Sequence, residues 1–273
     1  MEIELVSLDK VHVHEEIIPK PLSELLHNIK SSQIFRDPVI VDSRTLVVLD
    51  GMHRVAALRD MGCRYVVACL VDYLDPKIVV GCWNRVIRGE DVESKLMGVF
   101  KLLGLKVHYS TLDEATLALA ERKATAAFLT SNGCQLLKAP NTDIRESYDW
   151  IRRIEGAIKG EAFSMEYSLE SESIERIKSG EAQAALLLPQ VHKDEVLEAS
   201  LSGNIFIHKT TRHILPARPM NVGVPLEWLM GDRPLDEVNR LLAEKLSERK
   251  LERLPYGSVY EGRKYDEELL VFR

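Results

Sequence analysis

The pattern of hydrophobic and polar positions in the first third of the chain predicts short strands that alternate with helices. Alternating or β-branched runs indicate strands, and apolar residues spaced three and four apart after Pro21 indicate a helix. The turn residues Asp42-Ser43-Arg44 separate two β-branched runs and so predict a hairpin. In chain order we expect a strand over 2–8, a helix over 21–29, strands over 38–41 and 45–49, a helix over 52–61 ended by Gly62, and a strand over 65–71.

The middle of the chain repeats a helix and strand alternation that is typical of an α/β subdomain. Thr111 and Glu114 are spaced as a capping box, and Asn132-Gly133 is a hairpin turn sequence. The expected helices cover 91–103, 111–123 and 143–159, and two further helices are expected around Ile174 and around Val196. The expected strands cover 124–130, 134–138, 163–167 and 182–188.

The last part of the chain has a different character. Residues 205–228 are rich in proline, residues 234–251 form a charged amphipathic pattern that predicts a helix, and residues 269–272 predict a closing strand. We therefore divide the chain into an N-terminal domain (1–88), a middle α/β domain (89–204) and a C-terminal segment (205–273), the last with a loop at 208–216 and a closing helix.

Composition and charge narrow the class of protein. The chain has 273 residues, of which 45% are hydrophobic and 29% charged, and its formal net charge is −6. The acidic balance argues against an extended nucleic-acid surface, which needs a basic stripe to displace counterions. No apolar run reaches the ~18–20 residues that span a bilayer. Residues 1–5 lack the basic and apolar regions of a secretory signal, so we expect a cytoplasmic protein with no membrane partner.

Neither the cysteines nor the histidines indicate a structural metal. Cys63, Cys69, Cys82 and Cys134 form no CxxC pair and no zinc spacing, so we expect reduced, buried thiols. His12 and His14 are two apart, but the sequence offers them no third ligand.

The residues Asp50-Gly51-Met52-His53-Arg54 lie between a predicted strand and a predicted helix. Amide groups at a helix start have no partner inside the helix, and together with the helix dipole they attract anions. Gly51 would allow a phosphate to approach the backbone, His53 and Arg54 would add donors, and Asp50 is an oxygen ligand of the type that Mg²⁺ prefers. Taken alone, the same residues also suit an ordinary strand-to-helix turn with Asp50 as a cap.

The surrounding residues resemble the nucleotide-binding motif of the ParB/sulfiredoxin-like superfamily, in which a strand, a G-x-x-R turn and a helix hold nucleotide phosphates. Sulfiredoxins carry a catalytic cysteine in this turn, where Met52 stands here. ParB proteins carry G-E-R-R followed by a DNA-binding helix-turn-helix, and this chain has neither. The free serine kinases carry D-G-x-H-R, which Asp50 to Arg54 match.

Four further segments resemble the free serine kinases in the same order along the chain. His14-Glu15 resembles the H-E segment, Phe35-Arg36-Asp37-Pro38 the F-x-x-P segment, and Trp83 the tryptophan stretch. Thr210-Thr211-Arg212-His213, followed by Ile214-Leu215-Pro216, resembles the T-T-R-H-x-L-P motif. Together these motifs span residues 8–216, while residues 90–200 agree only in layout.

The resemblance implies a fold, a reaction and a set of site residues. It implies an α/β (α+β) protein, with a ParB/sulfiredoxin-like nucleotide-binding domain, a second α/β domain and an active site in the cleft between them. The reaction would transfer a phosphoryl group from ATP or ADP, with Mg²⁺, to free L-serine and give O-phospho-L-serine, an entry to cysteine synthesis. The chain continues past Trp228, which makes it longer than the compact ADP-using type and favours ATP.

The roles that the resemblance implies are specific to residues. Glu15 would accept the serine proton, Asp50 would assist and bind Mg²⁺, and the turn would bind nucleotide through Gly51, Met52, His53 and Arg54. Serine would be bound by Trp83, Thr210, Thr211, Arg212 and His213. We expect a monomer or small homo-oligomer with no nucleic-acid partner.

Two alternatives stay open at this stage. Another small polyol or amino acid could be the acceptor, because a family fixes the reaction better than the substrate. A ParB-like nucleotide-binding switch or transcription regulator without phosphotransfer would use the same turn, although it would need a basic DNA surface.

Overall fold

The computed structural model describes residues 2–159 and 163–273, which divide into two compact units. Unit 1 takes residues up to Val79, together with Lys193–His208 and His213–Arg273. Unit 2 takes Val80–His192 and Lys209–Arg212. The chain therefore passes repeatedly from one unit to the other. The domain edges that we placed near residues 88 and 204 stay predictions.

Unit 1 is built on a four-stranded sheet with the order β1 (Glu2–Ser7), β5 (Tyr65–Val71), β3 (Val39–Asp42), β4 (Val48–Asp50). Strand β5 pairs antiparallel with β1 and parallel with β3, and β3 pairs antiparallel with β4. All of β3 and nearly all of β5 is buried, as expected for strands covered on both faces. The predicted strand at 2–8, the hairpin and the strand at 65–71 are confirmed.

Both edges of this sheet are covered by side chains or backbone from elsewhere in the chain. At β1, the Leu5 amide donates to Asn239 Oδ1 at 2.6 Å and Asn239 Nδ2 donates to the Leu5 carbonyl at 3.0 Å. At β4, the Val48 amide donates to the His12 carbonyl at 2.8 Å. Each edge therefore has part of its backbone already hydrogen-bonded, which reduces what another chain could pair with.

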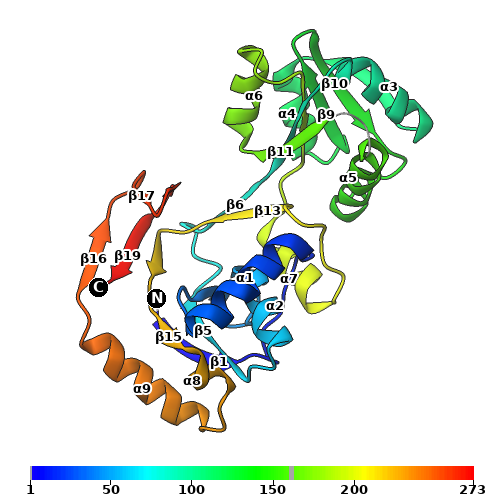
Figure 1. Cartoon of the computed structure of the whole chain (residues 1–273). Helices are drawn as coiled ribbons and strands as arrows, with labels where there is room; N and C mark the ends of the chain where they lie inside the picture. Colours follow the sequence, from blue (N-terminus) through cyan, green and yellow to red (C-terminus); the bar gives the residue numbers. More distant parts are fainter. Residues whose placement is uncertain (1, 160–162) are drawn as a thin grey trace. The chain divides into compact units, whose positions relative to one another are not determined.

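Helices complete the core of unit 1. Helix α1 (Pro19–Ser32) packs against α2 (Met52–Asp60), and α9 (Leu235–Ser247), which carries Asn239, packs on β1 (Figure 1). The remaining helices are α7 (Lys193–Leu201) and α8 (Leu226–Met230). The inward side chains of α1, α2 and α9, among them Ile29, Leu58 and Leu242, are buried in the core with the sheet residues. This one-sided burial accounts for the helical spacing of apolar residues in the sequence.

A second, smaller sheet in unit 1 joins residues that are far apart in sequence. Strand β14 (Ala217–Met220) pairs parallel with β19 (Glu268–Phe272), which pairs antiparallel with β16 (Leu251–Leu254). The closing strand is thus confirmed, but the helix predicted to reach Leu251 ends at Ser247 because Leu251 pairs with Phe272 instead. Two short pairs accompany the sheet, β2 (Ile34–Phe35) with β15 (Val224–Pro225) and β17 (Val259–Tyr260) with β18 (Arg263–Lys264).

Unit 2 is a six-stranded sheet with helices. Its order is β11 (Ser164–Ser168), β7 (Asn84–Arg88), β12 (Ala184–Leu187), β9 (Ala126–Thr130), β10 (Gly133–Lys138), β8 (Lys106–Ser110), and neighbouring strands pair antiparallel. Its helices are α3 (Val92–Leu102), α4 (Leu112–Ala120), α5 (Ile144–Ile158) and α6 (Glu170–Lys178). Strands β6 (Val79–Cys82) and β13 (Thr211–Ile214) form a separate pair.

The mixed α/β architecture predicted from the sequence is confirmed. The Thr111–Glu114 capping box is present in both directions, at 3.2 Å and 3.0 Å. Edge strand β8 was not predicted, because its largely exposed residues lack an apolar face. Among the described residues, no helix is both long enough and apolar enough to cross a membrane.

Candidate functional site

The predicted site residues fall into two groups, one in each unit. Glu15, Asp50–Arg54 and His213 lie in unit 1, whereas Trp83 and Thr210–Arg212 lie in unit 2.

The turn from β4 into α2 requires glycine at Gly51. Its φ of 96° lies in the left-handed region, where side chains are strained. A Cβ atom there would lie 2.8 Å from both the Arg54 guanidinium and a Val39 methyl group. Because the first amide to donate within α2 is that of Val55, to the Gly51 carbonyl at 3.0 Å, the amides before it point out of the helix start.

Arg54 lies underneath this turn and is held by three acceptors. Its Nη1 donates to the carbonyls of Asp37 and Pro38 at 2.9 Å and 2.7 Å, and its Nη2 donates to Asp50 Oδ2 at 2.7 Å. We predicted Arg54 as a direct phosphate donor. In the structure its guanidinium ties the turn to the residues before β3 and brings a positive charge close to the helix start.

Asp50 receives a second guanidinium on the same oxygen. Arg218, on β14, donates from Nη1 to Asp50 Oδ2 at 2.6 Å. No described residue donates a hydrogen bond to the other oxygen, Oδ1. Burial alone would raise the pKa of the Asp50 carboxyl, but Arg218 and Arg54 outweigh it and hold that pKa well below its usual range. Asp50 is therefore ionised, with one oxygen committed to arginines.

Sequence reasoning missed Arg218 and its partner Glu267. Arg218 Nε and Nη2 donate to Glu267 Oε2 and Oε1 at 2.7 Å and 3.0 Å, and both side chains are almost fully buried. Nothing in the Pro-rich segment marks Arg218 as buried. The only available signal was its position shortly after the T-T-R-H-like motif.

Glu15 lies beside the strand that leads into the turn. The Phe206 amide donates to the His14 carbonyl at 2.8 Å and the Glu16 amide donates to the Phe206 carbonyl at 2.9 Å, so the backbone around Glu15 is fixed on both sides. The residues before it run parallel to β4 through the His12–Val47 bridge. Glu15 is only 5% exposed, which excludes the solvated acidic pair that its sequence position beside Glu16 would otherwise suggest.

Two buried histidines support the end of β4. His14 donates from Nδ1 to the Val48 carbonyl at 2.8 Å, since a carbonyl can only accept. His213 bonds the Leu49 carbonyl and its Nε2 accepts from the Tyr73 hydroxyl at 2.8 Å. Burial lowers the pKa of both imidazoles, and His14 lowers that of His213 further. Both rings are therefore neutral near pH 7.

His53 also makes a contact that the sequence did not suggest. Its Nε2 accepts from the Ile18 amide at 3.0 Å, which joins the start of α2 to the backbone that follows Glu15. The turn and the Glu15 segment are thus connected both along β4 and through His53. The structure brings together Glu15, Asp50, Gly51 and His53 within one part of unit 1.

The unit 2 group is arranged around Trp83. Its indole Nε1 donates to the Thr211 carbonyl at 3.1 Å. Two cations face its ring, Lys209 Nζ at 4.9 Å and the Arg212 guanidinium carbon at 5.9 Å from the ring centre. Lys209 was not predicted. The Trp83 ring is therefore faced by two positively charged side chains.

Buried polar residues hold the segment that carries Thr210 to Arg212. Arg85, fully buried, donates from Nη1 to the carbonyls of Trp83 and Lys209 at 2.6 Å and 2.8 Å, and from Nε to Glu155 at 2.6 Å. The Tyr148 hydroxyl donates to the Pro189 carbonyl at 2.9 Å and lies 3.4 Å from that of Thr210. These contacts fix the backbone of the segment relative to β7.

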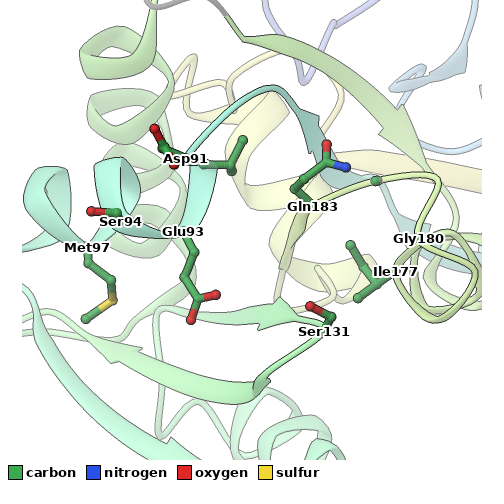
Figure 2. A pocket seen from close by; sticks show the side chains of 10 residues that line it. Asp91, Glu93, Ser94, Met97, Ser131, Ile177, Gly180 and Gln183 are labelled. Carbon is green, nitrogen blue, oxygen red and sulfur yellow. The ribbon is translucent and has the colours of Figure 1, made fainter.

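An open depression of about 600 Å³ lies elsewhere in unit 2 (Figure 2). Its described lining includes Asp91, Glu93, Ser131 and Gln183 and none of the predicted site residues. The Glu93 carboxylate already accepts a hydrogen bond at Oε2 from Asn132 Nδ2, at 2.7 Å. We assign no role to this depression.

The four cysteines are free thiols in the interior of the protein. All four cysteines are buried and unpaired by disulfides, as predicted, and burial raises the pKa of Cys63 to about 11 and of Cys69 to about 12. Across residues 2–159 and 163–273, no three His, Cys, Asp or Glu side chains cluster as a metal site.

Comparisons with known proteins agree with the motifs. An ATP-dependent L-serine kinase of Staphylothermus marinus is 27% identical over 231 residues, covering 82% of this chain and 90% of the relative. An ADP-dependent L-serine kinase of Thermococcus kodakarensis is 25% identical over 235 residues, covering 82% and 91%. No family model matches the chain.

A solved structure shows the shared fold. A variant of a free serine kinase in complex with AMP superposes with a TM-score of 0.73 at 22% identity, over 84% of this chain and 94% of that one. The resemblance predicted from the motifs is confirmed, and it extends through the middle of the chain, where the sequence matched only in layout.

Proposed function

We propose that this protein is a kinase that transfers a phosphoryl group from ATP or ADP to the hydroxyl of free L-serine and releases O-phospho-L-serine. The observation that carries the proposal is the convergence, in unit 1, of a left-handed glycine turn at a helix start with an ionised aspartate and a buried glutamate. Phosphoryl transfer needs these elements, because it depends on positioning, charge neutralisation and a proton acceptor.

In this proposal the nucleotide phosphates lie on the Gly51–Arg54 turn. The outward amides at the start of α2 would donate to phosphate oxygens, and Gly51 would let them approach the backbone. Arg54 would act through its charge while its donors hold the turn. His53, which accepts from the Ile18 amide, would keep the turn aligned with the segment of Glu15.

Asp50 fits a magnesium ion in one specific way. Its Oδ1 has no donor among the described residues, while Oδ2 is held by two arginines. Mg²⁺ commonly takes one or two carboxylates and fills its other positions with phosphate oxygens and water, so Asp50 alone is a sufficient protein ligand. Bound there, the ion would neutralise charge on the nucleotide phosphates.

Glu15 is the proposed base for the serine hydroxyl. Its buried carboxylate would accept the proton as the hydroxyl oxygen attacks the terminal phosphorus. The fixed backbone on either side of Glu15 restricts where its carboxylate can lie, which is what a positioned base needs.

The serine side of the proposal uses the unit 2 group together with His213. Trp83 would contact the substrate, and Arg212 with Thr210 and Thr211 would bind the serine carboxylate and later the product phosphate. Lys209, which faces the same ring, adds a positive charge to that set. His213, buried against Tyr73, would act mainly by supporting β4.

The test is phosphate transfer to free L-serine, with ATP and ADP supplied separately and with Mg²⁺ present or chelated. We expect O-phosphoserine, read by mass spectrometry, only with Mg²⁺. Glu15→Gln should lower turnover by about 100-fold or more, in the range for general-base removal, while nucleotide binding changes little. The matched control is Glu16→Gln, which alters the neighbouring carboxylate.

Two outcomes would contradict the proposal. A Glu15→Gln enzyme with near-normal turnover would refute the role of Glu15. Folded protein that binds nucleotide but forms no phosphoserine with either donor would favour another acceptor or a ParB-like nucleotide-binding switch. The cytoplasmic location, the monomeric or small homo-oligomeric state and the link to cysteine synthesis stay parts of the proposal.

A further inference from the structure

Arg218 reaches the candidate phosphate site from a sheet that the motifs do not include. It lies on β14, 168 positions from Asp50 in sequence, and is only 8% exposed. Strand β14 is held parallel to β19, with Arg218 opposite Leu269. The position of the guanidinium at Asp50 therefore depends on how these two strands pair.

Glu267, immediately before β19, determines the orientation of that guanidinium. It accepts two parallel hydrogen bonds, from Nε at 2.7 Å and from Nη2 at 3.0 Å, and is itself only 7% exposed. This bidentate geometry fixes the plane of the guanidinium. Once two of its nitrogens face Glu267, the third, Nη1, is directed at Asp50 Oδ2.

Four charged side chains are joined in this cluster. Asp50 and Glu267 are the anions, and Arg54 and Arg218 are the cations that contact them. Without Glu267, Arg218 would be a buried cation with two donors unsatisfied, a state that favours reorientation of the side chain. Arg218 would then move toward water or toward both oxygens of Asp50, including Oδ1.

We propose that Glu267 is a positioning residue for the candidate reaction, which acts through Arg218 to keep Asp50 Oδ1 available and correctly oriented at the phosphate-binding turn. This inference rests on the proposed function. It makes the β14–β19–β16 sheet part of the nucleotide site. Its effect should appear in the nucleotide parameters and leave the KM for serine within about two-fold, because Glu267 acts through Arg218 on Asp50 at the phosphate-binding turn.

The test is a double-mutant cycle with Glu267→Gln and Asp50→Asn. Partners that orient a ligating carboxylate typically contribute about 10–100-fold, so Glu267→Gln should lower kcat/KM for the nucleotide by that factor. In the Asp50→Asn background the same substitution should change it by less than about two-fold, because the group through which Glu267 acts is gone. The control is Glu268→Gln, since Glu268 also binds an arginine, Arg253, at 2.9 Å but at the surface.

The same cycle is measured in binding, which needs no turnover. Calorimetric titration of ATP and ADP with Mg²⁺ should show a Kd weakened about 10-fold by Glu267→Gln only when Asp50 is present. If wild-type protein forms no phosphoserine but this coupling is found, the proposed reaction fails and the positioning role stands.

Independent effects would overturn the inference. If Glu267→Gln lowers kcat/KM or weakens binding equally in both backgrounds, or changes neither, Glu267 does not act through Asp50. Thermal melts identify variants that do not fold. If Glu267→Gln does not fold, Glu267→Asp, which keeps the carboxylate but shortens the side chain, replaces it in the cycle with the same expected coupling.

Discussion

Substitution of Gly51 by alanine tests the most constrained point of the proposed phosphate site. An alanine at φ 96° pays the left-handed penalty of about 1–2 kcal/mol. Its Cβ would also lie 2.8 Å from Val39 Cγ1 and from the Arg54 guanidinium. Arg54 cannot move aside without losing bonds to Asp50 and two carbonyls, so overpacking adds about 1–3 kcal/mol. We expect a total loss of about 2–5 kcal/mol in the free energy of unfolding.

Gly62, at the other end of the same helix, provides the matched control. Its φ is 69°, but a Cβ there would meet no atom within 4 Å. Gly62→Ala should therefore show only the backbone cost of about 1–2 kcal/mol. Urea unfolding of both variants gives the difference, and titration with ATP or ADP should show weaker binding for Gly51→Ala alone. Equal stability losses, or unchanged nucleotide binding in Gly51→Ala, would refute the reasoning about this turn.

Three further predictions concern buried or capping residues. Burial lowers the pKa of His14 and His213 below 6.5, so the unfolded chain binds protons first as pH falls. The free energy of unfolding from urea titrations should therefore change little between about pH 6.5 and pH 8, and should fall below pH 6.5 by up to about 1.4 kcal/mol per pH unit for each histidine. No loss between about pH 7 and pH 5.5 would contradict their neutral state. Arg85→Met should cost about 3–5 kcal/mol by leaving the partly buried Glu155 and the carbonyls of Trp83 and Lys209 without their donor, and a double Arg85→Met/Glu155→Met variant should regain the part of that stability that comes from the ion pair in the same assay. Thr111→Ala should cost about 0.5–2 kcal/mol through the lost cap, measured by thermal unfolding, whereas an unchanged melting temperature would mean that the cap contributes nothing.

Local pattern was sufficient for most helices and strands, including the strand and the helix that flank the candidate phosphate turn. The strand at Tyr65–Val71 and the capped helix after Thr111 follow from periodicity and capping chemistry, which act over a few residues. Strand β16 was not predicted, and its first residue, Leu251, was assigned to a helix. The strand is stabilised by pairing with β19, and a pattern within 251–254 cannot show that partner.

The contacts of the site residues could not be read from the sequence in the same way. Arg54 and His53 were expected to face a ligand, yet each is bonded to the protein backbone. Arg218 and Glu267 are 49 positions apart and owe their burial to each other's charge, which no local property of either residue indicates. The motif therefore predicts where the site lies, whereas the contacts around the candidate site residues depend on the whole fold.

The discontinuous composition of unit 1 affects how the protein is made. Its first segment ends at Val79, but Asn239 must cover the edge at Leu5 and Glu267 must reach Arg218 before the unit is complete. Unit 2 comes almost entirely from one stretch, Val80–His192, and can fold as it leaves the ribosome. Until Asn239 has been synthesised, the edge of strand β1 at Leu5 stays uncovered. High sequence separation of this kind slows folding, so nascent unit 1 is the part of the chain for which we expect dependence on chaperones.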